Sequence, residues 1–218
     1  MIKKIHSLKS SISIIAGLTL LSACTAYQAI YDVSLSQVTR PLNATEQYGE
    51  YTLVDNDTNK KYTYEDGLIE GVFVLGEKSV IFGITNKTSH IIKINWDEAA
   101  FIDENGNASR VVHSGIRYLD MNSPQSPSII IGGGKLQDVA TPTSNVHYSK
   151  ESGWYSRDIL LNFSYNKDEL VGWSNGYIGK ELKFLLPLVI EGVQNDYIFT
   201  FKVNTAEITT AAGVQIVW

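Results

Sequence analysis

The sequence has few of the residues from which disulfides, metal centres and basic binding surfaces are made. Cysteine occurs once in 218 residues, so no disulfide can form within the chain. His90, His113 and His147 stand far apart with no second ligand two to four residues away, so zinc-ligand spacing is absent. Lysine and arginine total 18 against 23 acidic residues, and the net charge of −5 argues against a nucleic-acid partner.

Long apolar runs are also missing. The longest, Ile12–Leu21, is ten residues, whereas a membrane-spanning helix needs about 20. Lys3, Lys4 and Lys9 precede it and small residues follow it. A basic start, a short apolar run and small residues at its end are typical of a secretory signal peptide.

The end of this run, Leu21-Ser22-Ala23-Cys24, resembles the lipobox of bacterial lipoproteins. The resemblance implies cleavage after Ala23, diacylation of the Cys24 sulfur and attachment of the protein to a membrane through these acyl chains. Thr25 stands where an aspartate would favour retention in the inner membrane, so the family pattern implies the outer membrane, with the body facing the periplasm. The alternative is an ordinary cleaved signal peptide beside a chance cysteine, which would release a soluble protein.

Three segments are expected: a signal peptide over 1–23, a lipidated tether with a possible first strand over 24–45, and a β-sandwich domain over 46–218. Removing residues 1–23 leaves 195 residues and takes away three lysines, for a net charge of −8. That length suits one all-β domain with a sizeable core.

Alternating apolar residues predict strands along most of the chain, and helical periodicity is nearly absent. The expected strands are 31–38, 48–54, 68–75, 80–85, 90–96, 129–131, 182–189, 197–203 and 214–218. A polar turn over 86–89 predicts that 80–85 and 90–96 form a hairpin, and Asn105-Gly106 predicts another. Pro187 indicates an edge strand or a bulge, and the one short helix is expected over 166–171.

Short strands joined by Asn, Gly and Asp turns predict an all-β sandwich. The section Val80–Ile131 resembles the immunoglobulin-like domains of bacterial envelope proteins. The resemblance depends on the Asn86 turn, Trp96, the Asn105-Gly106 hairpin and the glycine-rich turn 132–134. It covers about a quarter of the chain and implies an immunoglobulin-like sandwich.

Motifs that would indicate catalysis or ion binding are incomplete. Gly172-Trp-Ser174-Asn-Gly176 matches the G-x-S-x-G elbow of serine hydrolases, but no βαβ pattern precedes it. Gly132–Lys135 lacks the first glycine and the Ser or Thr of a phosphate loop. Asp55, Asp57, Asn59 and Asp66 have calcium-loop spacing, but lysine occupies the position that needs glycine. No cofactor is expected.

The most promising binding residues are the aromatic side chains Trp154, Tyr155, Trp173 and Tyr177, which lie among Gly, Asn and Ser. Such rings can stack on sugars or anchor a protein partner; alternatively, they cover the open end of the sandwich. The sequence therefore predicts a lipid-anchored, non-enzymatic envelope protein that binds a protein or glycan. Two alternatives stay open: an envelope serine hydrolase using Ser174, and a structural accessory subunit of an outer-membrane assembly.

Overall fold

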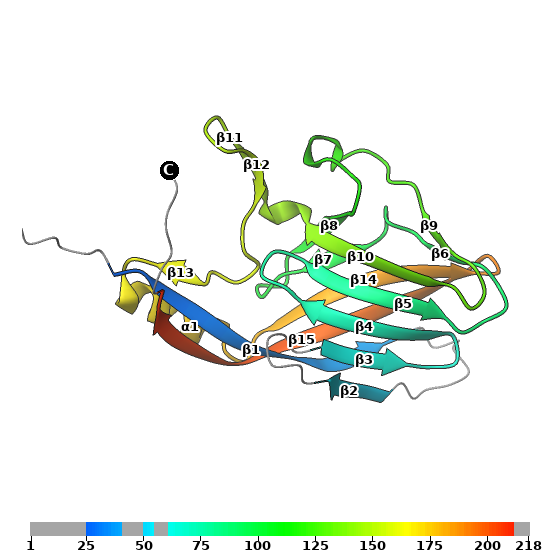
Figure 1. Ribbon diagram of the computed structural model, residues 1–218, viewed down its shortest axis with the longest axis horizontal. Coiled ribbons are helices and arrows are strands. Elements are labelled where there is room, and N and C mark those ends of the chain that lie inside the picture. Colours follow the sequence, from blue (N-terminus) through cyan, green and yellow to red (C-terminus); the bar gives the residue numbers. More distant parts are fainter. Residues whose placement is uncertain (1–24, 41–49, 55–60, 212–218) are drawn as a thin grey trace, which may run out of the picture.

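The protein is built mainly of antiparallel strands (Figure 1). The computed structural model describes residues 25–40, 50–54 and 61–211. The first strands are β1 (Tyr27–Thr39), β2 (Glu50–Val54), β3 (Lys61–Glu65), β4 (Ile69–Leu75), β5 (Val80–Asn86), β6 (Ile92–Ile94), β7 (Ala100–Ile102) and β8 (Ala108–His113). The later strands are β9 (Ser128–Ile130), β10 (Lys135–Pro142), β11 (Val146–Ser149), β12 (Gly153–Ser156), β13 (Phe163–Ser164), β14 (Glu181–Ile190) and β15 (Val193–Thr210). One α-helix, α1 (Lys167–Tyr177), and two 3-10 turns, Tyr118–Asp120 and Thr143–Asn145, complete the described part.

A single hydrogen-bonded path of strands curls over to make two layers. Its order is β13-β1-β15-β14-β7-β8-β10-β5-β4-β3-β2, and β6 joins β14 to β9. One layer holds β1, β15 and β14, and the other holds β10, β5, β4 and β3 (Figure 1). The predicted all-β, sandwich-like fold is confirmed. In the described part of the chain, no helix is both long and apolar enough to cross a bilayer.

Aromatic side chains from the two layers meet in the core. Phe73 on β4 stacks on Phe199 of β15 with ring centroids 3.8 Å apart, and Phe82 on β5 lies 5.6 Å from Phe184 of β14. All four are at most 2 % exposed. Because alternate residues of a strand face opposite sides, each of these strands places one apolar row inside.

The prediction that 80–85 and 90–96 form a hairpin is wrong. β5 pairs with β4 and β10, whereas β6 pairs with β14 and β9 in the other layer. The segment between them therefore crosses from one layer to the other. Asn86 holds this crossing, because its side-chain amide donates to the carbonyls of His90, at 2.6 Å, and Ile130, at 3.0 Å. The Asn105-Gly106 hairpin is confirmed as the β7–β8 connection, with Gly106 at φ 85°.

Pro187 lies in a central strand and not at an edge. β14 pairs along its whole length with β15, and its other side is shared by two shorter strands. β7 pairs as far as Leu185 and β6 begins at Leu188, so Pro187 falls in the gap between them. Its carbonyl accepts from the backbone of Asn95 on that side. The missing N–H of proline therefore costs no ladder hydrogen bond.

The first strand begins earlier than the alternation suggested. β1 starts at Tyr27, and it pairs with β15 from Tyr27 to Thr39. Most of the segment expected to serve as a tether is therefore strand, and only Thr25 and Ala26 precede it among the described residues. The lipobox, the turn carrying Asp55 to Asn59, and the expected strand 214–218 lie outside the described residues.

Candidate binding site on an aromatic hairpin

The strands β11 and β12 form a hairpin that stands away from the sandwich (Figure 1). They pair only with each other among the described strands, from Val146↔Ser156 to Ser149↔Gly153. Gly153, at φ 70°, adopts the left-handed conformation that the tight turn requires. Ser149 closes the turn, since its hydroxyl accepts a hydrogen bond from the backbone of Ser152 at 2.9 Å.

The base of this hairpin is fixed to the body. Val146 and Ser156 are buried where the two strands leave the sheet. The carbonyl of Asn145 accepts from the backbone of Arg157 at 2.9 Å, and its side-chain amide donates to the carbonyl of Asp158 at 3.1 Å. The hairpin is therefore a projecting arm with an ordered root.

Each face of the arm carries a pair of rings, because residues directly opposite each other in an antiparallel pair share a face. Tyr148 lies opposite Trp154, with ring centroids 5.4 Å apart and an interplanar angle of 60°. They are 61 % and 40 % exposed. His147 and Tyr155 occupy the other face with centroids 5.9 Å apart, and both are half-buried. The Tyr148–Trp154 pair thus offers two large rings to solvent on a hydrogen-bonded hairpin.

The structure divides the four predicted aromatic residues between two elements. Trp154 and Tyr155 lie on β12, whereas Trp173 and Tyr177 lie on α1, well apart from the hairpin in Figure 1. Trp173 is 36 % exposed, and Tyr177 is half-buried against the ring of Tyr31 at 5.8 Å. The four rings therefore do not form one cluster. Tyr148, which the four predicted residues omit, is the most exposed aromatic ring among the described residues. The available signal was the short segment with Ser152 and Gly153 that separates it from Trp154 in the sequence.

Ser174 occupies the interior of a helix and has no elbow around it. The helix α1 spans the whole G-x-S-x-G stretch, extending well beyond the expected 166–171. The residue is 1 % exposed, and its hydroxyl lies 3.1 Å from that of Tyr31. Because Tyr31 donates to the carbonyl of Leu161, the Ser174 hydroxyl is left to donate to Tyr31. Ser174 therefore packs α1 against β1.

His113 has a carboxylate partner of the kind that a catalytic base would need, as does the exposed His90, whose Nδ1 lies 3.1 Å from Glu191 Oε1. His113 Nδ1 lies 3.2 Å from Asp138 Oδ2, and its ring stacks on Trp96 at 4.3 Å. Its Nε2, which would face a nucleophile in a triad, is buried and has no hydrogen-bond partner in the described part of the chain. His113 thus acts as a packed core side chain.

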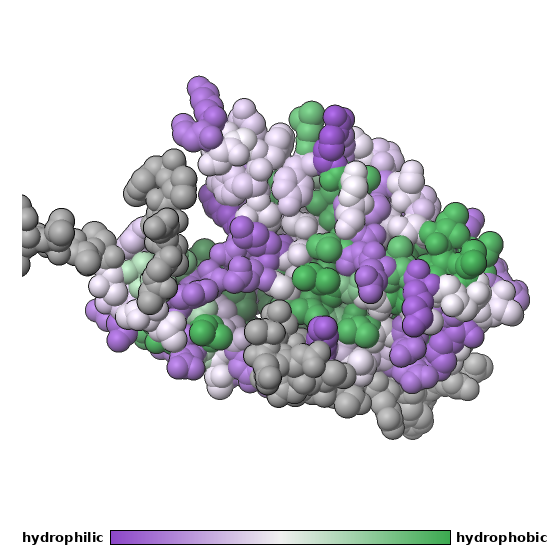
Figure 2. Space-filling view, viewed as in Figure 1, coloured by the Kyte–Doolittle hydropathy of each residue, from purple (hydrophilic) through white to green (hydrophobic). Residues whose placement is uncertain are grey.

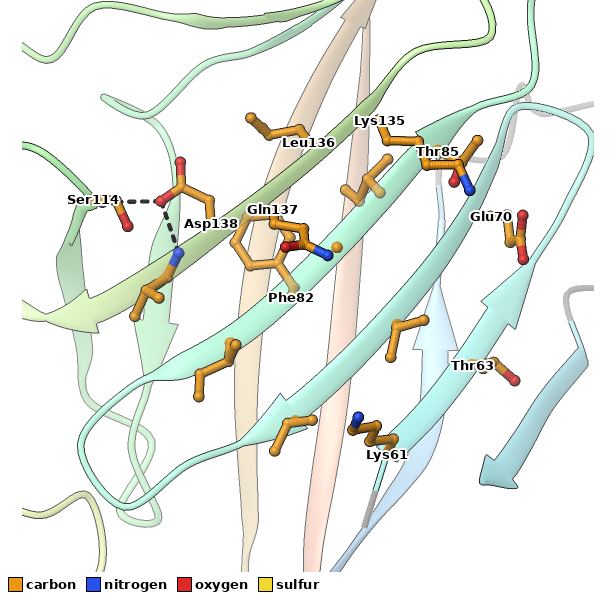
Figure 3. A pocket seen from close by; sticks show the side chains of 16 residues that line it. Lys61, Thr63, Glu70, Phe82, Thr85, Ser114, Lys135, Leu136, Gln137 and Asp138 are labelled. Carbon is orange, nitrogen blue, oxygen red and sulfur yellow. Dashed lines mark hydrogen bonds between the residues drawn. The ribbon is translucent and has the colours of Figure 1, made fainter. Parts of the chain in front are cut away.

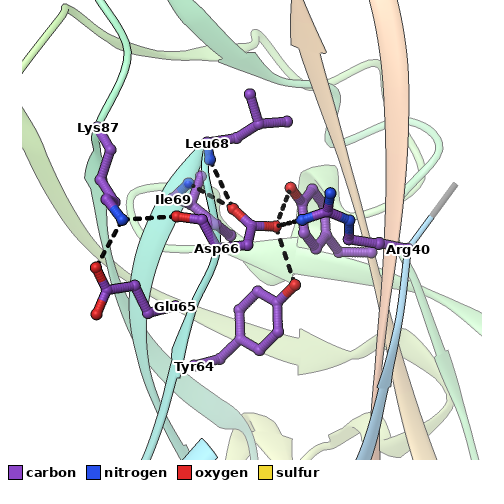
Figure 4. A network of polar contacts seen from close by, with 8 residues as sticks. Arg40, Tyr64, Glu65, Asp66, Leu68, Ile69 and Lys87 are labelled. Carbon is purple, nitrogen blue, oxygen red and sulfur yellow. Dashed lines mark hydrogen bonds and ion pairs between the residues drawn. The ribbon is translucent and has the colours of Figure 1, made fainter. Parts of the chain in front are cut away.

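Asp66, the last residue of the incomplete calcium-loop spacing, is the centre of a buried polar network (Figure 4). Its Oδ2 accepts from Arg40 at 2.5 Å and from the hydroxyls of Tyr64 and Tyr197, each at 2.9 Å. Its Oδ1 accepts from the backbone of Leu68 and Ile69. Burial alone would raise the pKa of Asp66, but these donors outweigh it and lower that pKa. Both oxygens are committed to the protein, and no cluster of metal-ligating side chains occurs among the described residues.

The glycine turn at 132–134 joins two strands. A Cβ at Gly132 would lie 2.9 Å from the backbone of Thr88 and Ser89, so glycine is required for the chains to approach. Gly133 has φ 70°. The turn is therefore shaped by the crossing beside it and not by a phosphate.

The outer face of the β3–β4–β5–β10 layer carries a shallow groove of about 720 Å³ (Figure 3). Register places Val72 beside Gly83 and Val74 beside Ile81 on its floor. Lys61, Lys135 and Gln137 contribute polar groups to its lining, and Gln137 lies over its middle (Figure 3). This outer face is therefore partly apolar, as Figure 2 also shows over the middle of the sheet.

Comparisons with known proteins do not identify a family. No family model matches the chain, and no curated protein matches it. One solved structure, described as "X-ray structure of Northeast Structural Genomics Consortium target SoR45", aligns over 84 % of this chain and 91 % of its own, at 12 % identity and a TM-score of 0.24. A similarity at that level carries no inference about this chain.

Proposed function

We propose that this chain is a lipid-anchored protein of the bacterial outer membrane, facing the periplasm, that binds a protein or glycan partner through the β11–β12 hairpin and catalyses no reaction. The observation that carries the proposal is the exposed Tyr148–Trp154 pair on its projecting arm. Tyrosine and tryptophan dominate binding energy at interfaces and offer a large contact area with few rotatable bonds.

The anchor part of the proposal is supported by the lipobox-like residues Leu21 to Cys24 and by the absence of any other cysteine. Two or three acyl chains hold a protein on a membrane where one chain would not. Metabolic labelling with a palmitate analogue should mark the wild-type chain, and Cys24→Ser should lose both label and membrane association. A Cys24→Ser chain that still matures and stays with the membrane would contradict the anchor.

The binding part can be tested with a double variant, Tyr148→Ala with Trp154→Ala. The matched control is Leu119→Ser, a change at another exposed apolar side chain outside the hairpin (66 % exposed). In envelopes treated with a mild crosslinker, the double variant should lose the adduct that wild type and control both form. Sedimentation with isolated peptidoglycan separates the partner classes. If the wild-type chain co-sediments with peptidoglycan and the double variant does not, the partner is a glycan.

If the double variant keeps every adduct and every glycan interaction, the hairpin is not the binding element. An adduct with one protein in a fixed ratio would favour the accessory-subunit alternative. Reaction of Ser174 with a fluorophosphonate probe would favour the hydrolase, against the burial of that side chain.

A further inference from the structure

Four apolar side chains gather where the chain enters the sheet. We call Ile30, Leu161, Phe163 and Tyr165 the anchor-end patch. β1 pairs with β13 at Gln28↔Phe163, and the hydrogen bond from Ala29 N to Asn162 O continues this pairing, so Leu161 lies opposite Ile30. The rings of Phe163 and Tyr165 contact each other at 5.4 Å. Ile30, Leu161 and Tyr165 are 55 %, 42 % and 49 % exposed.

The patch lies on the face of β1 that α1 does not cover. Tyr31, the neighbour of Ile30, turns its ring toward Tyr177 and Ser174 of the helix. Because successive strand residues face opposite sides, Ile30 points away from α1, and its pairing places Leu161 on the same side. Glu207 lies opposite Ile30 on β15 and limits the patch in that direction.

Chain length brings this face to the membrane that holds the anchor. Tyr27, the first residue of β1, is three residues after Cys24. Three extended residues reach at most about 10–11 Å, and the headgroup layer of one leaflet is about 5–8 Å thick. A chain acylated at Cys24 would therefore begin its first strand at the membrane surface, with almost no spacer.

We propose that the anchor-end patch rests in the headgroup region of the membrane that holds Cys24 and sets the orientation of the body on it; this rests on the proposed lipid anchor. Tyrosine is enriched at membrane interfaces because its ring is apolar and its hydroxyl polar. Two aliphatic side chains and two aromatic rings on one face provide the apolar surface that enters. Glu207 beside the patch keeps the contact shallow.

The test uses the acylated full-length product in vesicles of phosphatidylethanolamine and phosphatidylglycerol. An acylated Cys24 has no free thiol, so an introduced cysteine becomes the only site for a polarity-sensitive fluorophore. Tyr165→Cys places the label in the patch. Ile129→Cys, at a 61 % exposed residue of β9, is the control, and β9 pairs only with β6 among the described strands, far from α1 and β13 in Figure 1.

The label at residue 165 should show a blue-shifted emission and lose quenching by aqueous iodide when vesicles are present, while the label at 129 should show neither change. Adding Ile30→Ser and Leu161→Ser should abolish the shift at 165, whereas Ile131→Ser should not. Equal iodide access at both labels, or equal protection, would overturn the patch as the membrane contact. Labelling of the wild-type chain would instead show that Cys24 is free and overturn the anchor itself.

Discussion

Replacing Asp66 with asparagine should destabilise the fold more than any other single change in the buried polar network. Its side chain is fully buried, and that of Arg40, its ion-pair partner, is 10 % exposed. Breaking a buried pair by neutralising one partner costs about 3–5 kcal/mol, because the other charge stays buried without compensation. The Nε of Arg40 already has no partner among the described residues, and the neighbouring Tyr64 hydroxyl carries no charge that could replace the carboxylate. Asp66→Asn should therefore lower the free energy of unfolding by about 3–5 kcal/mol at pH 7.

The measurement is urea unfolding followed by circular dichroism, with Tyr197→Phe as the comparison. That variant removes one of the donors to Asp66 Oδ2 and leaves the ion pair, so it should cost about 1.5–3 kcal/mol. The difference between the two variants should shrink at acid pH. Because the pKa of Asp66 is lowered in the folded state, its stabilisation is complete above the ordinary carboxyl pKa and is lost as pH falls through the lowered value. Asp66→Asn unfolding at the wild-type urea midpoint would refute the reasoning.

Three further outcomes follow from local geometry. Gly71→Ala should lower the free energy of unfolding by about 1–3 kcal/mol, since a Cβ there would lie 2.5 Å from the buried Phe73 ring. The control is Gly83→Ala, whose Cβ would meet only Gln137 Cγ at 3.6 Å and a carbonyl at 3.7 Å. In the same urea assay, its free energy of unfolding should stay within about 0.5 kcal/mol of the wild-type value. Burial, and then the charge of Asp66, raise the pKa of Tyr64 to about 12. The contribution of Tyr64 to the free energy of unfolding is therefore complete below about pH 10, the pKa of tyrosine in the unfolded chain, and is lost as pH rises through 12. Tyr64→Phe should therefore flatten the loss of stability at alkaline pH, and an unchanged pH profile would contradict this. Asn166→Ala should cost about 1 kcal/mol, because the Asn166 side chain accepts from the backbone of Asp168 and Glu169 at the start of α1; thermal melting that is unchanged would show that the cap contributes nothing.

Period-two alternation predicted the strands that bury one face. β5, β14 and β15 follow the expected rows of apolar residues because their inner sides meet a core and their outer sides do not. β10 escaped prediction, since Asp138 occupies one of its inner positions and is held there by His113 and backbone donors. A buried carboxylate breaks the apolar pattern even where the strand is regular.

Pairings between distant strands could not be predicted from local signals. The turn at 86–89 has the composition of a hairpin turn, yet Asn86 directs the chain into the other layer. The expected strand 129–131 contains three isoleucines, but only Ile130 on β9 is turned inward, whereas Ile129 and Ile131 are 61 % and 65 % exposed. The network around Asp66 joins residues as far apart as Tyr64 and Tyr197. Such contacts depend on the order of strands, which composition does not encode.

The sequence indicated aromatic binding residues on the β11–β12 hairpin, but it did not predict which rings share a face. Trp154 and Tyr155 stood out as aromatic residues among small polar ones, but the same signal included Trp173 and Tyr177 on α1. Rings on a helix and rings on a hairpin look alike until the register is known. Only the pairing of Tyr148 with Trp154 shows which rings share a face.

The backbone of Ala211 donates to the carbonyl of Ala26 at 2.9 Å, so the polypeptide enters and leaves the sandwich at one place. β15, which ends just before Ala211, is 18 residues long and spans up to about 60 Å. Its other end begins directly after the Glu191-Gly192 turn. If Cys24 is acylated as proposed, an affinity tag or fluorescent protein fused after residue 211 would lie beside the proposed membrane contact. One inserted at Glu191-Gly192 would be displayed at the other end of β15.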